Sequence, residues 1–326
     1  MPRPLAAQAP VARFDASWDR DPPSRTLFEG EIVEIGAFRA TPRNPRFHDS
    51  GAIQNALLVF PRTTVRIRHE GERAFVATPA VITLYNRGQR YRRDSVDPAG
   101  DLCEWFAFRD DVLLDALATA EPAVRERPAR PFRRPFARSE HRLYLRQRLL
   151  VRRVVGARAG ELDRLSVEEE ALGLLDRFVA LAASGAPCAA PDALGAGQRD
   201  LVERLQAILG LRFHEDLSLA ALAAGVGCSP FYLARLFRRA TGSSIHAFRV
   251  ELRLRRSLEL LAGSDRDLSA VALDLGFGSH SHFTSAFRAA YGLTPSELRR
   301  TASRRRLDGL RARRPGRDPL ASTARV

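Results

Sequence analysis

The stretch Gly276–Arg299, GFGSHSHFTSAFRAAYGLTPSELR, contains the signals that decide the fold of the carboxyl-terminal third of the chain. Ser279 is a good helix N-cap, because its hydroxyl can accept a hydrogen bond from a free N–H of the first turn. Aromatic side chains then recur every four residues, as one apolar helix face requires, at Phe283, Phe287 and Tyr291. Gly292 tolerates the left-handed conformation that ends many helices. The stretch therefore predicts a capped helix over 280–291.

Further helix signals flank this predicted helix. Thr294 to Glu297 reads as a capping box with Pro at the first helical position, which predicts another helix start. Upstream, the apolar residues between Leu268 and Leu275 predict a short helix, and Gly276 supplies a tight turn. A short helix, a tight turn and a capped second helix together form a helix-turn-helix.

The same pattern occurs fifty residues earlier. Residues 229–242 match residues 279–292 in their Ser cap, their apolar stripe and their closing Gly. A short helix over Leu219–Ala224, capped by Ser218, precedes this first copy, and its turn reads Gly225–Cys228. A helical run over 245–262 connects the copies. An internal repeat of this kind predicts two helix-turn-helix units joined by one linker helix.

The second copy resembles the carboxyl-terminal signature of the AraC/XylS family of bacterial transcription regulators. The motifs that carry the resemblance are Gly276-Phe277, Ser281-x-Phe283, Phe287-Arg288 and Gly292-x-Thr294-Pro295-x-x-x-Arg299. The resemblance covers about 198–300, and both copies have the family's order and spacing. It implies a sequence-specific, effector-responsive DNA-binding transcription regulator, with activation as the commoner family role. Two alternatives stay open: a cupin-type enzyme with an accessory DNA-binding module, and an architectural DNA binder.

A helix that reads DNA turns polar side chains outward while its apolar stripe holds it to its domain. In the first copy, the side chains that are available to contact DNA are Phe231, Tyr232, Ala234, Arg235, Arg238 and Arg239. The resemblance assigns the base-facing positions to Phe231, Ala234 and Arg235. Arg235 can donate two hydrogen bonds to one guanine, which discriminates by roughly 1–3 kcal/mol. A solvated helix face or a phosphate contact is the alternative for Arg235.

In the second copy the predicted DNA contacts are Ser281, His282, Ser285 and Arg288. The three uncharged positions lack the bidentate strength of Arg, so we expect this helix to discriminate sequence less than the first. The linker helix, at ~1.5 Å per residue, spans ~27 Å. When the width of the packed units is added, the two recognition helices can be separated by one DNA turn, ~34 Å. Both recognition helices are therefore expected to enter successive major grooves.

The segment Leu27–Phe108 reads as short strands punctuated by Gly and Pro, which predicts a sandwich or small barrel. The expected strands are 28–35, 56–60, 65–69, 74–77, 81–85 and 102–108. The family resemblance implies a cupin-like effector-sensing domain at this place. The expected fold is therefore an α+β multidomain chain, with a β-sandwich or cupin-like N-terminal domain with flanking helices and an all-α C-terminal domain.

Between these domains the sequence predicts several helices. Asp110–Ala118 reads as a helix, and the Pro- and Arg-rich segment 121–136 is expected to be extended. A long helix is expected from Ser139-Glu140 to Val155, and another from a capping box at Ser166–Glu169 to Ala183. These last two helices either mediate a homodimer or cover one face of the β domain.

Composition divides the chain further. We expect disorder over 1–24, a sensor domain with its helical segment over 25–184, a linker over 185–197, a DNA-binding domain over 198–300 and a disordered Arg-rich tail over 301–326. The net charge is +14, and every one of the 52 basic residues is Arg. Arg favours bidentate contact with phosphate and guanine, although a GC-rich genome also encodes many arginines. We expect promoter DNA as the partner, with RNA polymerase, a small-molecule effector and a second copy of the chain as further partners.

Residues that hold metals or cofactors are not indicated. The sequence has no HExxH or CxxC motif, its β domain has no HxH, and its three cysteines, Cys103, Cys188 and Cys228, are widely spaced. His280 and His282 are spaced as a possible metal pair, but side chains two residues apart on a helix point about 200° apart, so we do not expect them to hold one ion. We therefore expect no enzyme activity, metal or cofactor. No apolar run reaches the ~20 residues of a membrane span, so a cytoplasmic protein without membrane contact is expected. For an effector, the candidates are Tyr85, Arg87 and Arg92 in a polar turn, with a surface hairpin as the alternative.

Overall fold

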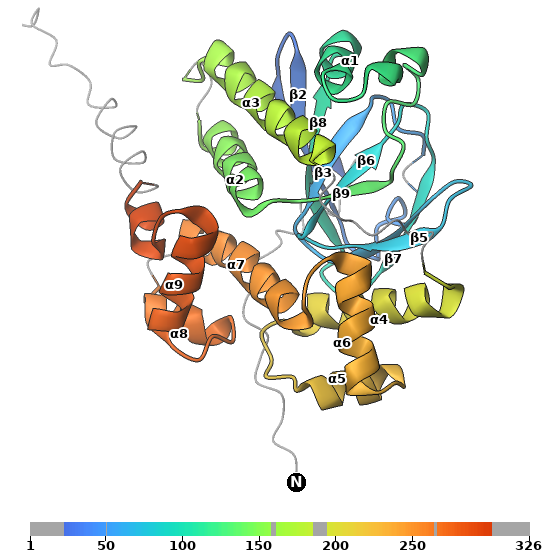
Figure 1. Cartoon of the computed structure of the whole chain (residues 1–326). Coiled ribbons are helices and arrows are strands. Elements are labelled where there is room, and N and C mark those ends of the chain that lie inside the picture. Colours follow the sequence, from blue (N-terminus) through green and yellow to red (C-terminus); the bar gives the residue numbers. More distant parts are fainter. Residues whose placement is uncertain (1–22, 50, 158–160, 185–193, 264–265, 302–326) are drawn as a thin grey trace, which may run out of the picture.

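The computed structural model describes residues 23–49, 51–157, 161–184, 194–263 and 266–301. The chain forms an N-terminal β domain with flanking helices, followed by a helical C-terminal domain (Figure 1). The expected α+β multidomain fold is confirmed. The predictions for 1–22, 302–326 and most of the linker lie outside the described residues; at its end, α4 already begins at Ala196.

Two antiparallel sheets form the β domain. The larger has the order β1-β2-β8-β3-β6-β9, and the smaller has the order β5-β4-β7. The strand bounds are β1 Ser24–Glu29, β2 Val33–Ala40, β3 Leu57–Pro61, β4 Val65–His69, β5 Ala74–Ala77, β6 Val81–Tyr85, β7 Tyr91–Ser95, β8 Asp101–Phe108 and β9 Phe136–Arg138. Alternate residues of β4, such as Val65 and Ile67, are buried between the sheets, whereas Arg66 and Arg68 face outward. The two sheets therefore form a sandwich with its own apolar core.

Three strand predictions were wrong in detail. The single strand expected over 28–35 is two strands, because the chain reverses at Gly30, whose N–H donates to the carbonyl of Val33 at 2.9 Å. Strand β7, YRRDS, was missed because three of its five residues are charged. Strand β9 was missed because it begins at the last residue of the Pro-rich segment; within that segment, Pro122–Glu126 forms the short helix η2.

Helices α1 Asp110–Ala118, α2 His141–Gly156 and α3 Arg164–Ala183 flank the β domain. In Figure 1, α2 and α3 lie together beside the larger sheet. The apolar residues of α3, including Leu174 and Phe178, are buried in one cluster with Ile35 and Phe106 of the sheet. Burial of this apolar face against the sheet fits the covering role of the two helices.

The capping box predicted at Ser166 was wrong. Helix α3 begins at Arg164, so Ser166 lies inside it, where its hydroxyl accepts a hydrogen bond from Arg153 Nη1 at 3.1 Å. The carboxylate of Glu168 accepts hydrogen bonds from the backbone N–H groups of Glu31 and Ile32, in the turn between β1 and β2. The start of α3 therefore lies two residues before the predicted cap, and Glu168 binds the turn between β1 and β2.

The C-terminal domain contains α4 Ala196–Arg212, α5 Leu219–Val226, α6 Pro230–Thr241, α7 Ile245–Gly263, α8 Leu268–Asp274 and α9 His280–Tyr291, and residues 295–301 are also helical. Helices α4, α5 and α6 share an apolar cluster with the first half of α7 and with Ala80 of the β domain. The second half of α7, with α8 and α9, joins the cluster of α2, α3 and the larger sheet. The two domains thus share their cores along α7.

Candidate nucleic-acid interface

The first helix-turn-helix unit consists of α5 and α6. Ser218 caps α5 by accepting a hydrogen bond from the N–H of Ala221 at 3.1 Å, and Ser229 caps α6 by accepting from Tyr232 at 3.3 Å. Gly227 ends α5 with φ 76°, a conformation that favours glycine. The two helices are bent by 85° relative to one another. This geometry is that of a helix-turn-helix.

The second unit, α8 and α9, repeats these features. Ser279 caps α9 by accepting from the N–H of His282 at 3.1 Å, and Gly276 makes the turn with φ 81°. A Cβ on Gly276 would lie 2.1 Å from the carbonyl oxygen of His214, so no larger residue fits there. The capping box at Thr294 and Glu297 is confirmed, since Glu297 Oε2 accepts from the N–H of Thr294 at 2.7 Å and Thr294 Oγ1 accepts from the N–H of Glu297 at 3.2 Å.

Helices α6 and α9 expose the same positions. Both have twelve residues, and in both the second, third, sixth, ninth and tenth residues are exposed while the fourth and eighth are buried. In Figure 1 the two helices lie at opposite ends of α7, with similar directions in that view. The duplication in sequence is therefore a duplication of exposed surface.

The exposed surface of α6 contains most of the predicted contacts. Phe231, Tyr232, Arg235, Arg238 and Arg239 are exposed, and Ala234 is half-buried. Phe231 is 76% exposed at the start of the helix, which is unusual for a large apolar side chain. Within the described part of the chain, the side chains of Arg235 and Arg238 have no hydrogen-bond or ion-pair partner.

Two of the predicted residues on α6 are engaged by α4. Arg239 donates from Nη2 to Gln198 Oε1 at 2.7 Å, and Gln198 Nε2 donates to the hydroxyl of Tyr232 at 3.1 Å. These contacts direct the polar ends of Tyr232 and Arg239 toward α4. Gln198 therefore positions one side of α6, and Arg235 and Phe231 are left as the stronger candidates for base contact.

On α9, Ser281, His282, Ser285 and Arg288 are exposed. The fifty-residue offset places Thr284, and not His282, opposite Ala234 of the first unit. Thr284 is half-buried like Ala234, and its Oγ1 lies 3.4 Å from Nε2 of His280. Sequence reasoning missed Thr284, although counting the repeat offset would have found it.

Helix α7 holds the segment that leads into the first unit. Arg249 donates from Nη1 to the carbonyl of Leu217 at 3.1 Å, and Arg253 donates from Nε to the carbonyl of Phe213 at 2.7 Å. Both carbonyls belong to the segment between α4 and α5. Arg249 therefore helps to hold the segment before α5 against α7.

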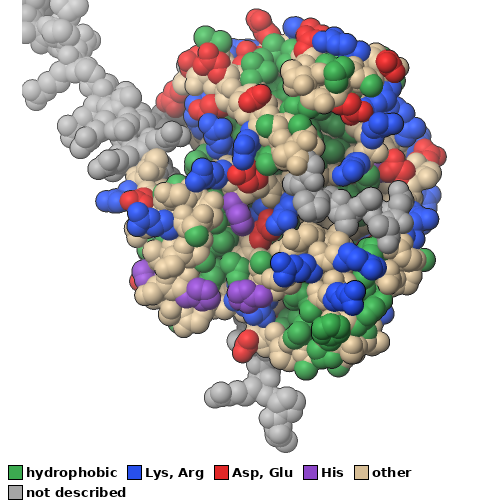
Figure 2. Space-filling view, in the orientation of Figure 1, with side chains coloured by type: hydrophobic (Ala, Val, Ile, Leu, Met, Phe, Trp, Pro, Cys, Tyr) green, Lys and Arg blue, Asp and Glu red, His purple; other side chains and the backbone are tan. Residues whose placement is uncertain are grey.

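Charge is distributed unevenly over this face. Figure 2 shows arginines over α6 with an apolar patch near α5, and histidines gathered over the end formed by α8 and α9. The pKa of His246, on α7, is lowered by burial and by the nearby Arg249 and Arg253. A neutral imidazole beside arginines avoids charge repulsion within this face.

The structure does not bring the three effector candidates together. Tyr85 is buried between the two sheets, whereas Arg87 is exposed and pairs with Asp110 at 3.2 Å. Arg92 is exposed on β7, and its neighbour Arg93 is the buried residue, paired with Asp101 at 3.2 Å. The site therefore remains a prediction without a common pocket.

The described residues contain neither a metal-binding cluster nor a single helix that could span a membrane. No group of three or more His, Cys, Asp or Glu side chains among them is arranged to hold a metal ion. Within the same ranges, no single helix is long and apolar enough to cross a bilayer, and α5 with α6 reaches that threshold only as a bent pair. Cys103 is buried and Cys228 half-buried, and neither forms a disulfide within the described residues.

Known proteins resemble the C-terminal part of the chain. A family model described as a helix-turn-helix domain matches residues 222–301. The uncharacterized HTH-type transcriptional regulator YidL of Escherichia coli (strain K12) is 35% identical over 101 residues, which are 31% of this chain and 34% of YidL. The regulatory protein PocR of Salmonella typhimurium (strain LT2) is 35% identical over 85 residues, 26% of this chain and 28% of PocR. The chain therefore spans about a third of the length of these curated relatives.

Among solved structures, the DNA-binding domain of AdpA, in complex with a target DNA, is 30% identical to this chain. The match covers 33% of this chain and 97% of that domain, with a TM-score of 0.31, a value too low to support an argument from structure. The sequence match and the duplicated units agree with one another. Residues 222–301 of this chain therefore form a helix-turn-helix domain of the AraC type.

Proposed function

We propose that this chain is a sequence-specific DNA-binding transcription regulator that reads promoter DNA with α6 and α9 in successive major grooves. The observation that carries the proposal is the repeated exposure pattern of these two helices, each capped by serine and ended by a left-handed glycine. An apolar stripe buries one side of each helix, so the opposite side is available to a groove.

The two helices differ in the chemistry that they offer to bases. The first offers Arg235, which can form paired hydrogen bonds with a guanine, and Phe231, which can contact a thymine methyl group. The second offers the hydroxyls of Ser281, Thr284 and Ser285, which donate or accept singly. The first half-site is therefore expected to be the more stringent of the two.

Selection of DNA from a random pool tests the proposal. We expect two conserved half-sites with centres about 10–10.5 base pairs apart. Binding to the selected sequence is expected to exceed binding to random DNA by at least ~10³. Equal affinity for selected and random DNA would contradict the proposal and favour an architectural binder.

The family resemblance adds further parts to this proposal. They are a location in the bacterial cytoplasm, activation through RNA polymerase, response to a small-molecule effector and association with a second copy of the chain. The matched relatives are transcription regulators, and no described feature favours the alternative of a cupin-type enzyme. Transcription in vitro from a promoter that contains the selected site tests activation directly.

A further inference from the structure

The side chain of Gln198, in the first turn of α4, holds two exposed residues of α6. Its Oε1 accepts a hydrogen bond from Nη2 of Arg239 at 2.7 Å, and its Nε2 donates to the hydroxyl of Tyr232 at 3.1 Å. Oε1 also accepts from the backbone N–H of Gly195 at 3.3 Å, which ties the amide to the start of its own helix. One amide thus makes three hydrogen bonds, and two of them reach across to α6.

The chemistry of the three partners fixes the orientation of the Gln198 amide. The guanidinium of Arg239 and the N–H of Gly195 can only donate, so both require the amide oxygen. The hydroxyl of Tyr232 can also accept, so it takes the amide N–H. The two bonds to α6 therefore support one another, because Tyr232 holds the amide in the orientation that Arg239 needs.

Arg239 keeps its positive charge in this arrangement. Its partner is a neutral amide, and the described residues supply no carboxylate that forms an ion pair with it. A hydrogen bond from an ionised donor is about twice as strong as one between neutral groups. Arg238, the preceding residue, is also exposed, and within the described ranges its side chain has no partner. The last turn of α6 therefore has one arginine that is held by α4 and one that is free to move.

The second unit does not repeat this bridge. Fifty residues further along the chain, the places of Gln198, Tyr232 and Arg239 are taken by Phe248, His282 and Ala289. Phe248 is buried, with its ring centre 5.4 Å from that of Phe237. Ala289 has no side-chain donor. The bridge is thus a property of the first unit, the one that we expect to discriminate sequence more strongly.

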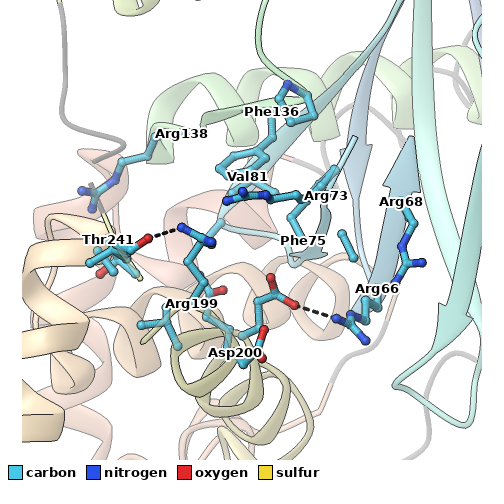
Figure 3. Close-up of a pocket in the computed structure, with 18 of the residues that line it drawn as sticks. Arg66, Arg68, Arg73, Phe75, Val81, Phe136, Arg138, Arg199, Asp200 and Thr241 are labelled. Atoms are coloured by element: carbon cyan, nitrogen blue, oxygen red, sulfur yellow. Dashed lines mark hydrogen bonds and ion pairs between the residues drawn. The ribbon is translucent and has the colours of Figure 1, made fainter. Parts of the chain in front are cut away.

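The first turn of α4 gives Gln198 a different neighbour from the residue that follows it. Arg199 lines the interdomain cavity of about 790 Å³ that β4, β5, β6 and β9 form with α4, α6 and α7 (Figure 3). Gln198 is not among the residues that line this cavity, because successive residues of a helix are turned by about 100°. Two adjacent side chains therefore serve different surfaces, and that of Gln198 reaches the exposed side of α6.

We propose that Gln198 is a positioning residue that withholds Arg239 from the phosphates of DNA and so limits binding to DNA of any sequence. The inference rests on the function proposed above in one respect, namely that α6 faces DNA. Phosphate contacts carry no direct sequence information, and each one that a basic residue adds raises the affinity for every sequence. With Arg239 held, the binding of α6 depends more on the side chains that we propose to read bases.

The salt dependence of binding to random DNA tests the role of Gln198. Methionine has a similar helix propensity and lacks the amide that holds Arg239. Gln198→Met should raise the affinity for random DNA at least about threefold at about 0.1 M salt. The slope of log affinity against log salt concentration should steepen by about 0.9, the value for one added phosphate contact.

Gln206→Met is the matched control. Gln206 is a half-buried glutamine of the same helix, and within the described part of the chain its side chain forms no hydrogen bond with α6. Its replacement should leave the affinity for random DNA and the slope unchanged. An unchanged slope in Gln198→Met, or an equal change in both variants, overturns the proposal. A loss of stability alone would not alter the slope, so the measurement separates withholding from a structural role.

Two variants of Arg239 test the same inference from the other side. Arg239→Ala in the native chain should leave the slope for random DNA unchanged, because the held guanidinium contributes no phosphate contact. The double variant Gln198→Met/Arg239→Ala should return the slope to the native value. A slope that is shallower by about 0.9 in Arg239→Ala would mean that this guanidinium already contacts phosphate, which overturns the proposal. A double variant as steep as Gln198→Met would assign the gain to another group and overturn it as well.

Titrations with the selected DNA separate this inference from the proposed function. A native chain that binds selected and random DNA equally contradicts sequence-specific regulation, while a steeper slope in Gln198→Met still supports the withholding of Arg239. A native chain that prefers the selected DNA, with no change of slope in Gln198→Met, leaves the function standing and overturns the withholding. A chain that binds neither DNA contradicts both.

Discussion

Arg255 on α7 donates two hydrogen bonds to Ser139, from Nη1 to Oγ at 2.9 Å and from Nη2 to the carbonyl oxygen at 2.6 Å. The same guanidinium contacts the carbonyl of Pro79 and the carboxylate of Glu251, and its carbon lies 4.6 Å from the ring centre of Tyr144. The side chain is fully buried. One residue of the C-terminal domain thus satisfies polar groups of both the β domain and its own helix.

Replacement of Arg255 by Ala should strongly destabilise the chain. The buried carboxylate of Glu251 would lose its nearest cation, and two backbone carbonyls would lose their donor. Breaking a buried pair costs about 3–5 kcal/mol of unfolding free energy, which chemical denaturation measures. Arg125→Ala, which breaks an exposed pair with Asp115, should cost less than about 1 kcal/mol. A similar small loss in both variants would show that the Arg255 contacts do not hold the domains together.

Gly210→Ala tests the contact between α4 and the β domain. A Cβ at Gly210 would lie 2.3 Å from Oγ1 of Thr64, so the two elements would have to separate. Alanine normally favours a helix over glycine by roughly 0.5–1 kcal/mol, and we expect the clash to reverse that sign. Gly197→Ala, in the first turn of the same helix with open space around its Cβ, serves as the control. A gain in melting temperature for Gly210→Ala equal to that of the control would contradict the close approach.

Arg235→Ala should weaken binding to the selected DNA site by roughly 1–3 kcal/mol, with little loss on random DNA, because a bidentate guanine contact is specific. Fluorescence anisotropy on both DNAs measures the difference. Arg239→Ala is the matched control on the same helix, since Gln198 already holds that guanidinium. Equal losses on both DNAs for Arg235→Ala would make Arg235 a phosphate contact.

His69 should make stability depend on pH. It is 1% exposed among Phe75, Tyr85 and Tyr91, and burial lowers its pKa to about 4, although Glu72 Oε2 lies 3.7 Å from Nδ1. Between the unfolded pKa of about 6.5 and about 4, the unfolded chain binds a proton that the folded chain does not. Stability is therefore complete above that window and falls by up to about 3 kcal/mol as the pH decreases through it.

His69→Phe checks this assignment. The replacement keeps the aromatic contacts and removes the titrating group, so its unfolding free energy should vary less between pH 7 and pH 4 than that of the native chain. Denaturation at several pH values gives both curves. Parallel curves would mean that other groups cause the acid sensitivity.

The sequence predicted those elements whose signals are local. Helix α1 has the predicted bounds, α6 and α9 begin at the predicted serine caps, and β4 has the strict alternation of a half-buried strand. Each of these signals lies within a few residues of the element that it specifies. The two copies in the sequence form two similar structural units because their caps and apolar stripes are local signals too.

Contacts between distant segments could not be predicted in this way. Strand β7 reads as charged, yet Arg93 is 1% exposed because Asp101 pairs with it and Phe38 covers it at 4.0 Å. The residues of the interdomain cavity come from segments more than a hundred residues apart. The charged residues of β7 do not reveal which of them pairs with a distant carboxylate. The effector prediction therefore selected Arg92, which is exposed, and not the buried Arg93.

A second buried cluster, made of ion pairs, restricts the movement of α7. Glu259 of α7 is held by Arg62, and by Arg148 of α2 at 3.0 Å, and both arginines also bind Glu104 of β8. Burial alone would raise the pKa of Glu259, but Arg148, Arg62 and Arg256 hold it below its usual value. A partial shift of α7 would strip a charged carboxylate of its cations without offering it water. Displacement of this helix should accordingly be costly unless the arginines of the cluster move with it.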